Sequence, residues 1–208
     1  MAGIPSISSY RLPHRDEIAP NVAPWQVDPQ RAVLLVHDMQ RFFLRPLPPQ
    51  DLASALVGNV ETLIGRARAL GMPVAYTAQP GGMTPQQRGL LRDFWGEGMK
   101  VDPQDRHLDV RCASRDGDWL LTKWRYSAFF NTDLLRLMRE HGKQQLIICG
   151  VYAHIGILAT AIEAFSHDLE TFIVSDAVAD FSRQDHVATL NYAAQACACI
   201  VATGEVLA

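Results

Sequence analysis

Hydrophobic residues along the chain occur in short continuous runs that alternate with stretches of three- and four-residue period. The run RAVLLVHD at residues 31–38 is typical of a strand that is covered on both faces. Residues 52–70 then carry apolar side chains at helical spacing, and Gly71 is the residue expected just beyond a helix end. This alternation predicts a parallel sheet whose crossover connections are right-handed helices.

The same pattern continues to the end of the chain. Further strands are predicted at residues 72–79, 118–123, 145–152, 171–177 and 200–207. Longer helices are predicted at residues 132–142, 155–168 and 182–198, with a short helix in the loop 80–96. Asn131 or Thr132 is expected to cap the first of these helices, and Ser182 with Asp185 forms a capping-box-like start of the last. The predicted fold class is α/β, a three-layer αβα sandwich.

The first 30 residues differ from the rest of the chain. They are rich in proline and polar groups and show no sustained period, so we expect an arm that packs on the domain. Residues 31–208 are then expected to form a single domain, since 208 residues suit one core.

One predicted helix is unusually apolar. In IGILATAIEAF, residues 155–165, Glu163 is the lone charge. A helix that is apolar on every side must be buried on more than one side. Either it is central to the domain or it packs against a second subunit, and we favour a homodimer.

Composition narrows the possible partners and the compartment. The net charge of −3 gives no basic footprint for nucleic acid or an anionic membrane. The sequence contains no apolar stretch long enough to span a bilayer and does not begin with a signal peptide, so a cytoplasmic location is expected. The 4 cysteines are expected to be buried and reduced, because no second Cys pair or nearby histidine completes a zinc site.

Polar side chains collect where the predicted strands end. In open parallel sheets, ligands bind beyond the carboxyl ends of the strands. The residues that fall at this edge, or in the loop after the second strand, are Asp38, Gln79, Lys123, the turn at 150–154, Arg88 and Trp95. Taken singly, an aspartate can cap a turn, a lysine or arginine can be solvated, and a tryptophan can be core. Together they indicate a site.

Several common kinds of catalytic site are excluded. The sequence has no Gly-x-Ser-x-Gly nucleophile elbow, no phosphate loop and no His-Glu-x-x-His metal helix. Its 7 histidines show no ligand spacing, and we interpret His37 and His154 as pocket or core residues. Neither a metal nor a cofactor is expected.

These residues resemble a known family. The segments LLVHDMQ, LTKWRYSAF and the glycine-valine turn CGVYAH are similar to those of the isochorismatase-like hydrolases. Most members use an Asp-Lys-Cys triad, and their cysteine falls at the position of Gly156 here. Members that cleave isochorismate-type vinyl ethers carry glycine instead. Across nearly the whole chain, the segments are most similar to the phenazine-biosynthesis members.

The resemblance implies a six-stranded sheet, a homodimer, no cofactor and a non-proline cis peptide at Val151–Tyr152. It implies release of pyruvate from 2-amino-2-deoxyisochorismate, with Asp38 as the acid. It also implies that the substrate pocket is lined by Lys123, Gln79, Arg88, Trp95 and Tyr152. Phe42 is expected to form an apolar wall of the pocket together with Trp95 and Tyr152.

A vinyl ether is opened by a proton and needs no enzyme nucleophile, so a glycine at position 156 is interpreted as space for substrate. Burial would raise the pKa of Asp38 and Lys123 would lower it, and the sequence leaves that balance open. Two other functions remain: hydrolysis of isochorismate itself, and ligand binding without catalysis.

Overall fold

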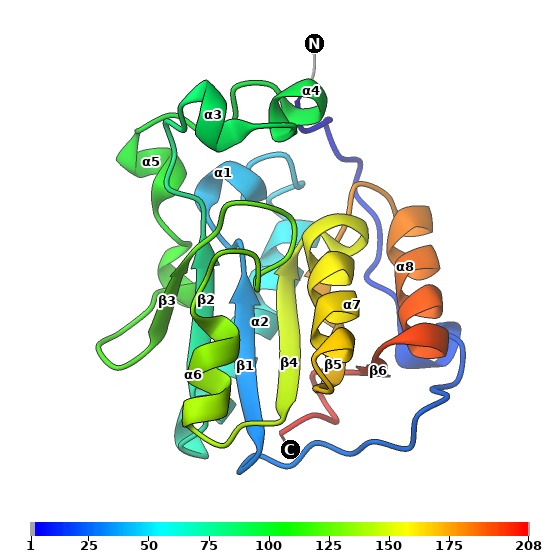
Figure 1. The fold of residues 1–208 in the computed structure, drawn as a ribbon. Helices are drawn as coiled ribbons and strands as arrows, with labels where there is room; N and C mark the ends of the chain where they lie inside the picture. Colours follow the sequence, from blue (N-terminus) through cyan, green and yellow to red (C-terminus); the bar gives the residue numbers. More distant parts are fainter. Residues whose placement is uncertain (1–2, 208) are drawn as a thin grey trace.

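The computed structural model describes residues 3–207 of the chain, which form a parallel sheet covered by helices on both faces (Figure 1). Its 6 strands lie in the order β3-β2-β1-β4-β5-β6, and every pairing is parallel. The strands are β1 Ala32–His37, β2 Val74–Ala78, β3 Trp119–Thr122, β4 Gln145–Val151, β5 Glu170–Ala179 and β6 Cys199–Val201. The predicted fold class is confirmed.

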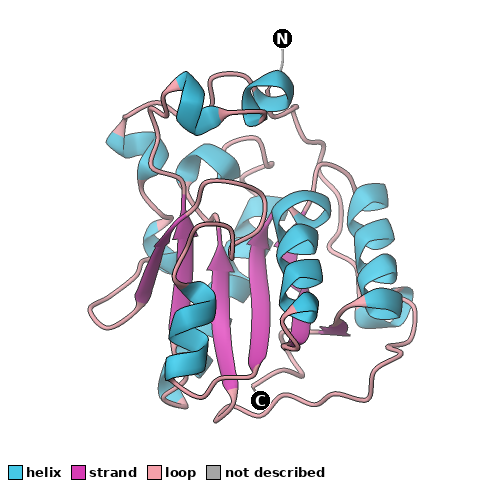
Figure 2. Cartoon of the chain, viewed as in Figure 1, coloured by secondary structure: helices cyan, strands magenta, loops and turns pink. Residues whose placement is uncertain are grey.

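The helices connect the strands and cover the sheet (Figure 2). They are α1 Arg41–Leu44, α2 Leu52–Ala69, α3 Pro85–Arg88, α4 Leu91–Trp95, α5 Pro103–Arg106, α6 Leu134–Glu140, α7 Leu158–Ser166 and α8 Arg183–Ala196. The predicted long helices are all present, and Gly71 has a φ of 65° just beyond α2, as expected of a residue that ends a helix.

Strand β1 shows why the run AVLLV has to be apolar throughout. Successive side chains of a strand point to opposite faces, and here each face meets a different core. Leu34 and Val36 pack in the cluster that includes α2, whereas Val33 and Leu35 pack in the cluster that includes α6, α7 and α8. A polar residue at any of these positions would be buried without a partner.

Three local expectations differ from the structure. Helix α6 begins after Asp133, later than expected, although the Thr132 hydroxyl accepts a hydrogen bond from the Leu134 amide in the first turn. Strand β6 ends at Val201, because it pairs with only three residues of β5 and the chain then turns. Helices α1 and α5 were not predicted, since segments of four residues carry no periodicity.

The N-terminal segment lies along the side of the domain (Figure 1). Ile7 and Ile18 are buried, and the Tyr10 hydroxyl accepts a hydrogen bond of 2.7 Å from the Asp180 amide at the end of β5. Farther toward the N-terminus, Gly3 and Ile4 reach the edge of the sheet where the strands end. The segment thus contributes side chains to the domain core.

Helix α7 buries only part of its apolar surface within one chain. Ala161 and Ala164 are fully buried against the sheet, whereas Ile162 and Phe165 are exposed by 41% and 49%. None of the helices within residues 3–207 has the length and hydropathy needed to cross a membrane.

Candidate active site

A cavity of about 310 Å³ opens at the carboxyl edge of the sheet, above the ends of β1, β2, β3 and β4. The strand order changes direction between β1 and β4, which is the place where open α/β sheets bind ligands. Helices α3 and α4 lie over this edge (Figure 1). The volume is within the range of small-molecule sites.

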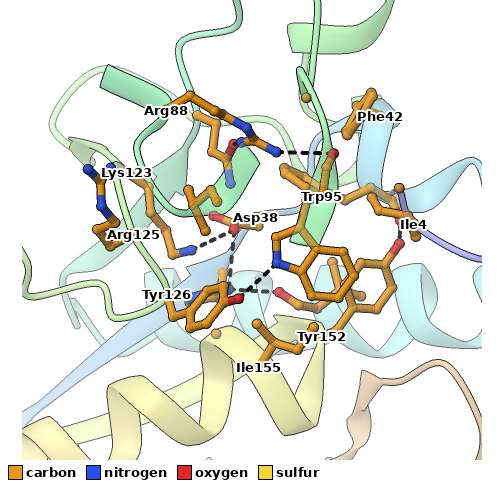
Figure 3. Close-up of a pocket in the computed structure, with 18 of the residues that line it drawn as sticks. Ile4, Asp38, Phe42, Arg88, Trp95, Lys123, Arg125, Tyr126, Tyr152 and Ile155 are labelled. Atoms are coloured by element: carbon orange, nitrogen blue, oxygen red, sulfur yellow. Dashed lines mark hydrogen bonds and ion pairs between the residues drawn. The ribbon is translucent and has the colours of Figure 1, made fainter. Parts of the chain in front are cut away.

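Asp38 and Lys123 form a buried ion pair in this cavity (Figure 3). Asp38 follows β1 with a φ of 52°, a left-handed conformation that aspartate tolerates better than most residues. The Lys123 ammonium donates to Asp38 Oδ2 at 2.9 Å, and both residues are less than 5% exposed. Thr77, on β2, donates to Asp38 Oδ1 at 2.6 Å and accepts from the Asp38 amide at 3.0 Å.

These contacts determine the charge of the Asp38 carboxyl group. Burial raises its pKa, but the Lys123 ammonium and the Thr77 hydroxyl outweigh burial and hold the pKa below the usual aspartate value. The pKa of His37 is lowered as well, to about 4, because complete burial disfavours the charged imidazolium. At neutral pH the cavity therefore contains the ionised carboxylate of Asp38 and the neutral imidazole of His37.

Arg88 is held at the rim of the cavity by three acceptors. Its guanidinium donates to the Gly96 carbonyl at 3.0 Å, the Gln79 side-chain oxygen at 3.3 Å and the Trp95 carbonyl at 3.5 Å. Only 6% of the residue is exposed, and this burial lowers its pKa. A fixed, partly desolvated guanidinium is suited to bind a carboxylate in two-point geometry.

Aromatic side chains line the rest of the cavity. Trp95 donates from Nε1 to the Tyr126 hydroxyl at 2.8 Å, and this bond joins α4 to the loop after β3 (Figure 3). Phe181 lies with its ring centroid 4.7 Å from that of Tyr152 and 5.8 Å from that of Trp95. The Tyr152 hydroxyl donates to the Phe43 carbonyl, and burial raises its pKa. Tyr152 therefore presents its ring rather than its hydroxyl.

The turn after β4 has an irregular backbone. The Val151–Tyr152 peptide is cis, as the resemblance implied. Gly150 has a φ of 116°, and a Cβ atom there would lie 2.1 Å from the His37 carbonyl oxygen. Residues Ala153–Ile157 then form a π-helical turn that leads into α7. No side chain larger than glycine fits at position 150.

The structure brings together all the site residues that the sequence predicted. The cavity is lined by Asp38, Lys123, Gln79, Arg88, Trp95, Tyr152, Phe42 and Gly156. Sequence reasoning missed Arg125, Tyr126, Ile155 and Phe181, which line it too, and Thr77, which bonds to Asp38. Arg125 and Tyr126 come two and three residues after Lys123 in the strand-end loop, so their position was a usable signal. Phe181 follows β5, an end the prediction passed over.

Other candidate groups lie outside this chemistry. His154 pairs with Asp180 at the end of β5, and its hydrogen bond to that carboxylate raises its pKa. Cys112, Cys149, Cys197 and Cys199 are buried and free. Among residues 3–207 there is no group of His, Cys, Asp and Glu side chains arranged to hold a metal ion.

Sequence comparison identifies relatives of this chain. The model of the isochorismatase domain matches residues 32–205. A phenazine biosynthesis protein, PhzD, of Pseudomonas fluorescens is 55% identical over 207 residues, which cover 100% of both chains. An isochorismatase of Bacillus subtilis is 47% identical over 205 residues, which are 98% of this chain and 66% of that protein.

Solved structures share the fold at lower sequence identity. A cysteine hydrolase from Pseudomonas syringae pv. phaseolicola superposes with a TM-score of 0.81 at 23% identity, over 91% of this chain and 96% of that one. That likeness concerns the fold alone. The domain model and the full-length relatives go further, and they show that this chain belongs to the isochorismatase family.

Proposed function

We propose that this protein hydrolyses the vinyl ether of 2-amino-2-deoxyisochorismate, giving pyruvate and trans-2,3-dihydro-3-hydroxyanthranilate in phenazine or related antibiotic biosynthesis. The observation that carries the proposal is the buried carboxyl of Asp38, which lies 2.9 Å from Lys123 in a cavity of substrate size. The full-length similarity to PhzD supports this choice of pathway.

The reaction needs one proton and one water molecule. Asp38 protonates the methylene carbon of the enolpyruvyl group, and the ether oxygen stabilises the resulting oxocarbenium ion. Water adds to that cation and loses a proton, which gives a hemiketal. The hemiketal hydroxyl then loses its proton, and the ring oxygen gains one as its bond to the hemiketal carbon breaks, so that pyruvate and the ring alcohol leave. No covalent enzyme intermediate forms in this series of steps. A glycine at position 156, which offers no nucleophilic side chain, is consistent with such a mechanism.

Asp38 has to be protonated before it can act as the acid, whereas in the free protein Lys123 holds the pKa of Asp38 low. The substrate changes this balance because it carries two carboxylates. An incoming substrate carboxylate that also binds the Lys123 ammonium weakens the ion pair between Lys123 and Asp38. The negative charge of that carboxylate also disfavours an ionised Asp38 nearby. Substrate binding therefore raises the pKa of Asp38 and favours its protonated form, which is the form that acts as the acid.

The remaining residues orient the substrate. Arg88 binds one substrate carboxylate, since its guanidinium is fixed by Gln79 and by backbone carbonyls. The rings of Trp95, Tyr152 and Phe42 all line the cavity and form an apolar wall that holds the substrate ring and excludes bulk water.

We also propose that the functional unit is a homodimer that uses α7. Ile162 and Phe165 are exposed on this helix although both are large and apolar. A second copy of the same surface would cover them. Light scattering on the purified protein measures the mass directly, and a monomer of 23.1 kDa at micromolar concentration would contradict the dimer.

The decisive experiment couples pyruvate formation to lactate dehydrogenase. Wild-type protein is assayed with 2-amino-2-deoxyisochorismate and with isochorismate, which differ only in an amino or hydroxyl substituent on the ring. The amino substrate is expected to have the higher kcat/KM. Asp38→Ala is expected to lose activity by about 10²–10⁴-fold while the protein stays folded.

Two results would contradict the proposal. An Asp38→Ala variant that keeps more than about a tenth of the rate removes this residue from the acid role. A wild-type protein that binds the substrate but yields no pyruvate indicates a binding protein without catalysis. Faster turnover of isochorismate would change the substrate and leave the reaction type intact.

A further inference from the structure

His37 is a buried titratable residue that the proposed reaction does not use. It is the last residue of β1, immediately before Asp38, and it is fully buried beside the cavity. Its Nδ1 donates to the Val151 carbonyl at 2.7 Å, so the ring joins β1 to the turn after β4. Its Nε2 has no hydrogen-bond partner among the described residues. An unpaired buried polar atom is costly, so the ring is held there for another reason.

That reason is visible at Gly156, which faces the Cε1 and Nε2 atoms of the ring. A Cβ atom built on Gly156 would lie 2.3 Å from His37 Cε1 and 2.9 Å from His37 Nε2. The Tyr126 carbonyl oxygen would be 3.2 Å away. The imidazole therefore already occupies the space in which a side chain at position 156 would begin.

The backbone at Gly156 does not itself require glycine. The residue lies within the π-helical turn and has no positive φ. Glycines elsewhere in helices are not crowded in this way, and at Gly58 and Gly65 of α2 a Cβ atom would meet nothing within 4 Å. Glycine is needed at position 156 because the His37 ring lies next to it. This finding differs from the expectation that the missing side chain leaves room for substrate.

The ring also lies close to the acid. His37 Nδ1 is 3.8 Å from Asp38 Oδ2, and the two residues are adjacent in the chain. A displacement of the imidazole would thus move the end of β1 and the Asp38 carboxyl with it. The turn after β4 would move as well, through the bond to Val151.

We propose that His37 is a positioning residue: its imidazole fills the place of a side chain at position 156 and fixes Asp38 against the turn after β4. The role in turnover rests on the proposed function, whereas the steric pairing of His37 with Gly156 does not. The size of residue 37 and the size of residue 156 are therefore coupled. A larger residue at one position is tolerated only with a smaller residue at the other.

A double-mutant cycle tests this coupling. The variants are Gly156→Ala, His37→Asn and the double variant, measured for kcat, KM and Tm. Asparagine is smaller than histidine but still offers an N–H near the place of Nδ1, so the bond to Val151 can persist. Gly65→Ala is the matched control, since it adds the same methyl group to a helical glycine in open space.

We expect Gly156→Ala to lower kcat for pyruvate release about tenfold or more and to lower Tm, because extra methyl groups in a packed interior are poorly tolerated. KM should change little. In the His37→Asn background the same change should lower kcat less than about threefold and should leave Tm unchanged or higher, because the methyl group now fills a gap. Gly65→Ala should resemble the wild type in kcat.

Equal losses in both backgrounds would overturn the proposal, since the obstacle would then not be His37. A rise in KM in both backgrounds with unchanged Tm would overturn it too, and would mean that the glycine makes room for substrate. If Gly156→Ala alone does not fold, recovery of folded protein by the added His37→Asn supports the pairing and failure to recover refutes it. If the wild type releases no pyruvate, the proposed function fails, and the Tm cycle still decides the pairing.

Discussion

Variants of the ion pair between Asp38 and Lys123 can separate its contribution to catalysis from its contribution to the free energy of unfolding. The charges are 2.9 Å apart, and at an effective dielectric constant of about 20 their attraction is about 6 kcal/mol. Desolvation of two groups that are 4% and 3% exposed offsets much of that energy. Removing one charge leaves the other buried alone, which typically destabilises a protein by about 3–5 kcal/mol.

Three variants isolate these effects. Asp38→Asn keeps a residue type that tolerates the φ of 52°, and Lys123→Met keeps the length of the side chain without its charge. In urea unfolding, each single variant is expected to lose about 3–5 kcal/mol, and the double variant to regain most of it because no charge is left buried alone. The rate of pyruvate release should be at least about 10²-fold lower than that of the wild type both in Asp38→Asn and in the double variant.

Two outcomes would refute this reasoning. Losses of less than about 1 kcal/mol in the single variants would mean that the pair is solvated, as surface pairs are. Recovery of pyruvate release in the double variant would mean that Asp38 is not the acid. The pH dependence gives an internal check: the folded-state pKa of Asp38 is lowered, so its stabilisation is present above about pH 3.9 and is lost as the pH falls through the lower folded value.

Two further variants test Arg88 in the cavity and His154 at the end of β5. Arg88→Lys should raise KM about tenfold or more with a smaller change in kcat, because an ammonium cannot replace the two-point guanidinium contact; an unchanged KM would contradict this role. The wild type should have a higher Tm at pH 6 than at pH 9, and this difference in Tm should be smaller in His154→Gln. The bond to Asp180 raises the His154 pKa, so its stabilisation is complete below about pH 6.5 and is lost as the pH rises through the folded value. Equal pH dependence in both proteins would contradict it.

Much of the fold was predictable because its signals are local. The continuous apolar run of β1 required two covered faces, and the structure places its alternate residues in two separate cores. Helix α2 followed from apolar spacing and a terminal glycine. The short helices α1 and α5 lack such signals, and the end of β6 depends on how far β5 extends beside it.

The candidate site was partly predictable for a different reason. Residues at the carboxyl ends of parallel strands meet at one edge whatever the details of packing, so Asp38, Gln79 and Lys123 were predicted to converge. Thr77 was missed because it points to Asp38 only through the register of β1 and β2, which pairs His37 with Thr77. Phe181 was missed because it reaches the cavity from β5, beyond the residues considered.

The sequence by itself determined the layered α/β fold, the family and the set of polar groups at the sheet edge, because periodicity and strand ends are properties of the chain alone. The tertiary structure decided which groups are in contact and in what charge state, because burial and distance depend on segments far apart in sequence. His37 and Gly156 show the difference. In the sequence they are a strand-end histidine and a glycine of uncertain purpose, whereas in the folded protein the imidazole occupies the space that the glycine leaves.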